Sequence, residues 1–458
     1  MRIQANSIYE ADTASFLHPQ TNLAQHLRQG PFVIERGEGT WVYDEHGQSY
    51  VDATSGLWCA SLGFSQERLA RAAYDQMTRL GYYHSQAHYT HPMGTRLAER
   101  LVEMAPVPMS KALFQCSGSE ANDVAIKLVW HYHTIMGQPK KRKIIGRQMG
   151  YHGSTCASIS ASGKPDMHRD FGVPLQDFLH VSMPHYYRFH EEGESEEEFS
   201  ARLADELENL IQTEGPETIG GFIAEPVLGA GGAVPPPKGY FERVQNILRR
   251  YDILFIVDEV ICGFGRTGEM WGATTYDLKP DMLSCAKALS AGMAPISAVL
   301  VNDRIFDALL VQAGRVGHFA HSATYCAHPV AAAVANEVLD IYEEIDVVAR
   351  AREVGAYMME LANREAERPI VGDVRGVGML CAIELTGNKA TRAPLPDVER
   401  TAEFIAERGR AHGLLLRAIG PTLAFAPPLN SSKEDVNEIF TRFSRVLDDV
   451  ELASAQAQ

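Results

Sequence analysis

Two residues that could take part in covalent chemistry follow short apolar runs in the middle of the chain. Asp258 ends the strand-like part of ILFIVDE, which starts at Ile253, and Lys287 follows MLSCA. Continuous apolar runs of this length are typical of strands buried in a parallel sheet, and the carboxyl ends of such strands face the ligand crevice. We therefore predict that both side chains reach one crevice. Each pattern also has a simpler explanation. Asp258 could be a surface acid at the end of a strand, and Lys287 could be a lysine whose amine lies in solvent.

A third group of residues could hold a phosphate. Ser117, Gly118 and Ser119 precede a helical pattern that begins near Glu120. Backbone N–H groups, the helix dipole and two hydroxyl groups at such a helix start favour an anion, and Gly118 allows close backbone approach. The same residues also fit an ordinary capping box. They therefore indicate a phosphate site only in combination with Asp258 and Lys287.

A phosphate anchor, a carboxylate and an amine together match what pyridoxal 5'-phosphate (PLP) requires. An anionic Asp258 would keep the pyridine nitrogen protonated, and the ring would then act as an electron sink. Lys287, once displaced by a substrate amine, would stay tethered near the proton to be moved and could act as base and then as acid. The sequence thus predicts a PLP-dependent enzyme.

The elements that must position these residues alternate along the chain. Helical spacing, as at 239–251, alternates with short apolar runs at 143–145, 221–224, 253–257 and 298–301. This alternation predicts an α/β fold with a mostly parallel sheet covered on both faces. A hairpin is predicted at 41–52, and a long helical pattern at 329–368 leads into strand-like segments. We predict a small α+β domain built from both chain ends (1–65 and 331–458) around a large PLP-binding domain (66–330).

Composition narrows the class of partners. The 458 residues are 45% hydrophobic and 22% charged, and 42 Lys plus Arg against 58 Asp plus Glu give a net charge of -16. Such a charge repels phosphate backbones, so neither nucleic acid nor a membrane is the predicted partner. The seven cysteines contain no C-x-x-C pair, and the N-terminus has no basic start followed by an apolar run. We therefore predict reduced thiols and a cytoplasmic location.

Seven motifs spread over nearly the whole chain resemble one known family. They are SGLWCASLGF at Ser55, SGSEAN at Ser117, GYHGST at Gly150, AEPVLGAGG at Ala224, VDEVICGFGRTG at Val257, CAKALSAG at Cys285 and ATYCAHP at Ala323. Together they resemble the class III (ω-type) aminotransferases of the aspartate aminotransferase fold, PLP-dependent transferase fold type I, in the amine:pyruvate and β-alanine:pyruvate branch. The resemblance implies a homodimer with active sites at the interface. It also implies a ping-pong ω-aminotransferase working through pyridoxamine phosphate, with an amine or ω-amino acid as donor and a keto acid, pyruvate by branch, as acceptor.

The resemblance also implies residue roles. Lys287 would carry the cofactor, Asp258 would bind the pyridine nitrogen, and Tyr151 and Val260 would flank the ring. Thr324 would reach the phosphate from the other subunit. The full cofactor-binding set is Ser117, Gly118, Ser119, Tyr151, His152, Glu225, Asp258, Val260, Lys287 and Thr324, and the substrate-binding set is Trp58, Tyr151 and Arg417.

Substrate choice would depend on a few of these positions. The planar fork of Arg417 suits a carboxylate, so an amine that lacks one would need this charge moved aside. Glu225 could pair with Arg417 meanwhile, or it could be a simple strand-end acid. Gln86 and Ala87 stand where relatives of the branch tend to carry aromatic residues, which predicts a wider pocket.

Several alternatives stay open at this point. An aminomutase or a decarboxylating aminotransferase would share the fold and the motifs. A non-catalytic ligand-binding protein would need a damaged cofactor site, whereas Lys287 and Asp258 are both present. A nicotinamide-dependent oxidoreductase is disfavoured because no G-x-G-x-x-G opens a helix. His84, His88 and His91 lack an accompanying carboxylate or cysteine, so we predict no metal site.

Overall fold

The computed structural model describes residues 7–456, and its largest sheet has seven strands. The strands lie in the order β4 (Lys111–Gln115), β10 (Ser297–Val301), β9 (Met282–Cys285), β8 (Leu254–Asp258), β7 (Ile219–Ala224), β5 (Lys143–Arg147) and β6 (Phe178–Val181). Strand β10 is antiparallel to both of its neighbours, and the remaining pairs are parallel. The predicted mostly parallel sheet is confirmed.

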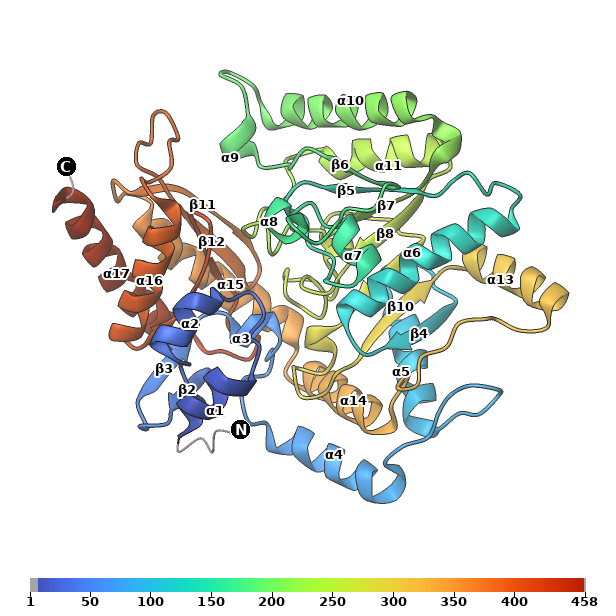
Figure 1. Ribbon diagram of the computed structural model, residues 1–458, viewed down its shortest axis with the longest axis horizontal. Helices are drawn as coiled ribbons and strands as arrows, with labels where there is room; N and C mark the ends of the chain where they lie inside the picture. Colours follow the sequence, from blue (N-terminus) through green and yellow to red (C-terminus); the bar gives the residue numbers. More distant parts are fainter. Residues whose placement is uncertain (1–6, 457–458) are drawn as a thin grey trace.

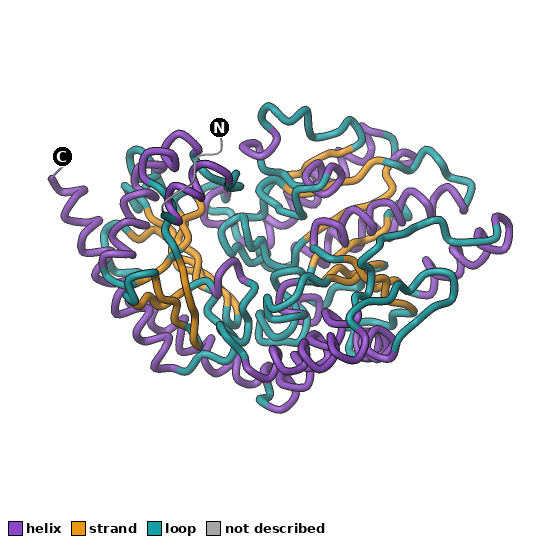
Figure 2. The backbone as a smooth tube through the Cα atoms, turned by 60° about the horizontal axis from the view of Figure 1, so that its bottom comes forward, coloured by secondary structure: helices purple, strands orange, loops and turns teal. Residues whose placement is uncertain are grey.

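Both faces of this sheet carry apolar side chains, and helices cover both faces. In β8, Leu254 and Ile256 pack into one core cluster, whereas Phe255 and Val257 pack into another. Successive side chains of a strand point to opposite faces, so a strand covered on both sides reads as a continuous apolar run. Figure 2 shows purple helices around the orange strands of this sheet. Figure 1 labels among them α6 (Gly118–Ile135), α7 (Cys156–Ala161), α10 (Glu196–Glu214), α11 (Tyr240–Arg250) and α13 (Asp303–Val316).

The two ends of the chain meet beside the large sheet. Strand β13 (Leu414–Leu415) extends the N-terminal sheet of β1 (Ile34–Glu38), β2 (Trp41–Asp44) and β3 (Ser49–Asp52), pairing Leu414 with Val51. In Figure 1 these blue strands lie beside red helices α16 (Val398–Ala411) and α17 (Lys433–Gln456). The third sheet, in the order given, consists of β11 (Val371–Val377), β12 (Leu380–Leu385), β15 (Thr422–Phe425) and β14 (Arg417–Ile419). The exact domain boundaries stay a prediction.

The long helical pattern predicted at 329–368 forms two helices. They are α14 (Pro329–Glu344) and α15 (Val347–Glu365), and Asp346 between them has a φ of 44°. The Asp346 side chain accepts a hydrogen bond from the backbone N–H of Ala349, so it ends one helix and caps the next. The other helices are α1 (Ile8–Ser15), α2 (Leu23–Gln29), α3 (Ser55–Trp58), α4 (Glu67–Leu80), α5 (Pro92–Glu103), α8 (Pro165–His168), α9 (Tyr186–Phe189), α12 (Gly272–Thr275), and the 3-10 turns Pro216–Thr218 and Lys287–Leu289. Across residues 7–456, no helix combines the length and the apolar character needed to cross a bilayer.

A buried cluster of charged residues connects the third sheet with the segment around α9, which follows the edge strand β6 of the large sheet. Glu384 of β12 accepts a hydrogen bond from Arg375 at 2.6 Å, lies 2.9 Å from the ring nitrogen of His185, and also pairs with Arg188. Burial alone would raise the pKa of Glu384. The hydrogen bond with His185 and the positive charges of Arg375 and Arg188 outweigh that effect and lower the pKa to about 2. The carboxylate is therefore charged in the folded protein.

Candidate active site

A cavity of about 410 Å³ lies at the carboxyl ends of β8 and β9. The structure brings nine of the predicted site residues to its wall: Ser117, Gly118, Ser119, Tyr151, His152, Glu225, Asp258, Val260 and Lys287. Trp58 and Arg417 lie next to this wall, as described below. Thr324 is an exposed residue outside the cavity of its own chain, and its carbonyl accepts a hydrogen bond from the Tyr82 hydroxyl.

Asp258 is held in one orientation by three donors. Its Oδ2 accepts a hydrogen bond from the side-chain amide of Asn122 at 2.8 Å and lies 2.8 Å from Nδ1 of His152. Its Oδ1 accepts the backbone N–H of Val260 at 3.0 Å. Because an ionised carboxylate only accepts hydrogen bonds, Nδ1 of His152 is assigned the proton. Nε2 of the same ring is buried and has no hydrogen-bond partner among the described residues.

Asn122 is a site residue that the sequence analysis missed. It is fully buried on α6, where its amide also donates to the carbonyl of His152 at 2.7 Å and its carbonyl accepts from the Ser284 hydroxyl at 2.6 Å. Asn122 is the last residue of the motif SGSEAN, and it is a polar residue on a helix whose neighbouring positions, such as Val124 and Ala125, are apolar. Asn122 therefore links β8 and β9 at the point where both strands end.

Lys287 begins a short 3-10 turn directly after β9, and its backbone has a φ of 45°. For a residue other than glycine this conformation costs on the order of 1 kcal/mol. Burial lowers the pKa of the Lys287 amine. Its Nζ lies 5.3 Å from the ring centre of Trp58, and the Arg417 guanidinium carbon lies at the same distance from that ring. Trp58 thus contacts both cations.

The start of α6 forms one wall of the cavity. Ser117 caps this helix, because its hydroxyl accepts the N–H of Glu120 and donates to the Glu120 carboxylate. The capping-box interpretation of these residues is therefore also correct. A Cβ atom on Gly118 would lie 3.0 Å from a methyl group of Val260, so a glycine fits best there. The Ser119 hydroxyl accepts the N–H of Ser154 at 3.1 Å. The positive end of an 18-residue helix faces the cavity at this point.

Glu225 is buried and makes its hydrogen bonds with the backbone. One carboxylate oxygen accepts the N–H of Tyr151 at 3.1 Å, and the other accepts the N–H of Gly229 at 2.8 Å. Burial raises the pKa of this carboxyl group. No ion pair joins Glu225 to Arg417 among the residues that the structure describes. The predicted exchange between these two side chains stays a prediction.

This arrangement fits PLP and defines a PLP-dependent enzyme. A buried carboxylate fixed by three donors suits a protonated pyridine nitrogen, a partly buried lysine suits an aldehyde, and a helix start with two serines and a glycine suits a phosphate. Residues 23–447 match the sequence profile described as Aminotransferase class-III. The chain belongs to the class III aminotransferases, which use PLP and have the type I fold.

Individual relatives agree with this assignment. Gamma aminobutyrate transaminase 3, chloroplastic, of Solanum lycopersicum is 46% identical over 92% of this chain and 81% of its own length. An omega transaminase of Pseudomonas jessenii, solved in complex with PMP, superposes with a TM-score of 0.97 at 46% identity, covering 98% of this chain and 99% of that one. A transaminase solved with L-ala superposes with a TM-score of 0.90 at 48% identity, covering 92% and 99%.

Proposed function

We propose that this aminotransferase takes an amino group from a primary amine or ω-amino acid and transfers it, by a ping-pong mechanism, to pyruvate. The observation that carries the proposal is the placement of Trp58 against both Lys287 and Arg417. The Arg417 fork can hold the carboxylate of a keto acid while Lys287 stays within reach of the neighbouring carbon. The indole ring offers an apolar wall to an amine. The L-ala found with one related transaminase is the amino acid that corresponds to pyruvate.

Cofactor binding and proton transfer would each depend on particular residues of this chain. When bound, PLP supplies an aldehyde that condenses with amines and a ring that withdraws electrons from the substrate carbon. Asp258, oriented by Asn122 and His152, would stabilise a proton on the ring nitrogen. Lys287 would move the proton at the substrate carbon, and its lowered pKa favours the neutral amine that can accept one.

The remaining contacts of the cofactor are also part of the proposal. Gly118 and Ser119 would bind the phosphate, with Thr324 reaching it from a second subunit. Tyr151 and Val260 would flank the ring, since both line the cavity beside Asp258. Ser117 would act through the helix cap, because its hydroxyl is engaged with Glu120.

A second candidate donor is γ-aminobutyrate, because a relative 46% identical to this chain is named for it. γ-Aminobutyrate is an ω-amino acid, and Arg417 could hold its carboxylate at the far end of the molecule. The two candidates differ in what an Arg417 variant would lose. With γ-aminobutyrate as donor, both half-reactions would depend on Arg417, whereas with an amine without a carboxylate only the keto-acid half-reaction would.

The absorbance spectrum of the purified holoenzyme tests these proposals. 1-Phenylethylamine, β-alanine or γ-aminobutyrate should bleach the yellow band, pyruvate should restore it, and Lys287→Ala should lack the response. Arg417→Leu should slow the recovery by pyruvate at least tenfold and leave bleaching by 1-phenylethylamine within about twofold. Recovery with 2-oxoglutarate but not pyruvate would contradict the acceptor, and a band that no amine bleaches would contradict the transaminase reaction itself.

We also propose a homodimer that works in the cytoplasm. Support for a dimer comes from Thr324, which is exposed in a single chain beside the exposed side chains of Tyr82 and Tyr325. All seven cysteines are free thiols, as expected in a reducing compartment. Light scattering should give twice the 50.5 kDa chain mass. Mixing Lys287→Ala with Thr324→Ala subunits should restore sites of wild-type cofactor affinity. A monomeric enzyme with full activity, or activity recovered outside the cytoplasmic fraction, would contradict these points.

A further inference from the structure

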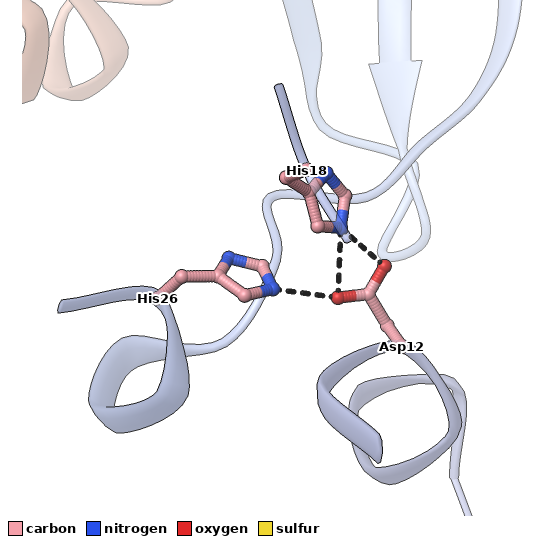
Figure 3. Close-up of side chains that lie close together, drawn as sticks. All are labelled: Asp12, His18 and His26. Atoms are coloured by element: carbon pink, nitrogen blue, oxygen red, sulfur yellow. Dashed lines mark hydrogen bonds and ion pairs between the residues drawn. The ribbon is translucent and has the colours of Figure 1, made fainter. Parts of the chain in front are cut away.

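The first described segment of the chain folds around one carboxylate. Asp12 lies on α1, His18 in the loop that follows, and His26 on α2 (Figure 3). Nε2 of His18 lies 2.8 Å from one Asp12 oxygen, and Nε2 of His26 lies 2.7 Å from the other. The three side chains are 13%, 24% and 11% exposed, in the order Asp12, His18, His26. Each imidazole ring thus points its Nε2 atom toward the partly buried carboxylate of Asp12.

We infer that Asp12, His18 and His26 form a binding site for a divalent transition metal ion, with zinc as the ion of best fit. The three ligand atoms all lie within 4.8 Å of one another. Zinc binds imidazole nitrogen and carboxylate oxygen at about 2.0–2.2 Å, which places neighbouring ligand atoms about 3.0–3.5 Å apart. The present separations therefore need to change by less than about 1.5 Å, and side-chain rotation about χ1 and χ2 supplies such shifts.

The donor set indicates which ions the site selects. Two of the three ligand atoms are imidazole nitrogens, which suit zinc and its transition-metal neighbours, whereas magnesium and calcium prefer oxygen ligands. Three protein ligands leave the remaining coordination positions for water or for a small anion. Among the described residues, this is the one group of three such side chains with ligand atoms this close together.

The surroundings of the cluster favour a metal over hydrogen bonds alone. No residue of α1 or α2 is buried, and large apolar side chains such as Phe16, Leu17 and Leu27 are exposed. Within one chain, a segment with so little apolar burial gains little stability from packing. A metal that joins residues 12, 18 and 26 would close two short loops and couple its binding energy to the folding of the segment. The contact of the Tyr9 ring with Gly30 already brings the segment's ends together.

The test is a zinc titration of the untagged holoenzyme after treatment with a chelator and buffer exchange. Isothermal calorimetry with ZnCl2 in excess Mg²⁺ should show one zinc ion per chain. Asp12→Asn and His26→Gln should each weaken zinc binding by about 100-fold or more, since even outer partners of metal ligands are worth about 10- to 100-fold. His46→Gln is the matched control, because His46 is 78% exposed and lies outside the cluster. Its zinc affinity should equal that of the wild type.

A second measurement keeps the test independent of catalysis and of folding defects. Co²⁺ bound at the site should give a visible ligand-field band that is lost in both cluster variants, while the cofactor band shows that each variant is folded and loaded. Absence of zinc uptake by the wild type would overturn the proposal. So would uptake that persists unchanged in Asp12→Asn and His26→Gln, because the zinc would then be held by cysteines or by other histidines.

Discussion

Replacing Asn122 with alanine should impair the cofactor site without unfolding the protein. The Asn122 amide donates to Asp258 at 2.8 Å and to the His152 carbonyl at 2.7 Å, and its own carbonyl accepts from Ser284 at 2.6 Å. In Asn122→Ala the carboxylate loses one of its three donors and becomes free to rotate. Its position relative to the ring nitrogen of PLP would then be less well defined.

The size of the effect follows from the type of bond that is lost. A hydrogen bond to a charged group contributes about 1.5–3 kcal/mol, and each 1.4 kcal/mol corresponds to a factor of about ten. We therefore expect PLP to bind about 10- to 100-fold more weakly to Asn122→Ala, with a similar fall in the rate at which an amine bleaches the cofactor band. Ser284→Ala removes only a neutral hydrogen bond, worth about 0.5–1.5 kcal/mol, so it should cost less than about tenfold.

The assay is a PLP titration of the apoenzyme followed by stopped-flow bleaching with a single amine. Thermal unfolding of both apo variants serves as a control for general destabilisation. The reasoning would be refuted if Asn122→Ala stayed within twofold of the wild type in both measurements. It would also be refuted if Ser284→Ala caused an equal loss, because the contact with Asp258 would then not be the one that matters.

Three further changes probe other parts of the structure. Glu384→Gln removes the buried carboxylate that Arg375 and Arg188 share and leaves Arg375 with Asp373 alone, so it should lower the free energy of unfolding by about 3 kcal/mol at pH 7. Because the folded pKa of Glu384 is lowered to about 2 from 4.5, this difference should shrink as pH falls below about 4.5, and a pH-independent difference in urea unfolding would contradict it. Trp58→Gly should raise the rate with bulky amines relative to small ones, since it empties a buried wall beside Lys287; an unchanged ratio of kcat/KM values would count against that role. Gly118→Ala should weaken PLP binding about tenfold, because its Cβ would press on Val260 at 3.0 Å, and equal affinity in a PLP titration would show that the valine yields freely.

The central part of the fold and site could be predicted because local patterns determine them. Strands β8 and β9 are covered on both faces, so each reads as an apolar run, and the residue that ends each run lies at the cavity edge. The placement of Asp258 and Lys287 at one cavity was predicted in this way. By contrast, the break between α14 and α15 was missed, since apolar residues continue up to Ile345 and the left-handed Asp346 carries no periodic signal.

Contacts between distant segments could not be predicted from spacing. Asn122 is one polar residue in an apolar helix, and nothing local distinguishes a structural amide from one that holds Asp258. The cluster of Asp12, His18 and His26 was overlooked because its members come from two helices and a loop. Only the tertiary structure brings such residues together.

In the proposed reaction the same cavity accepts a keto acid, which carries a carboxylate, and an amine that need not carry one. One way to achieve this would be for Glu225 to neutralise Arg417 when no substrate carboxylate is present. Both Glu225 oxygens accept backbone hydrogen bonds, from Tyr151 and Gly229, and leaving a buried N–H without a partner costs about 1–3 kcal/mol. Arg417 is only partly buried and begins a three-residue strand, with its guanidinium carbon 5.3 Å from the ring centre of Trp58. Movement of Arg417 is therefore the less costly way to switch between the two substrates, and Glu225 would stay in place to hold the backbone around Tyr151.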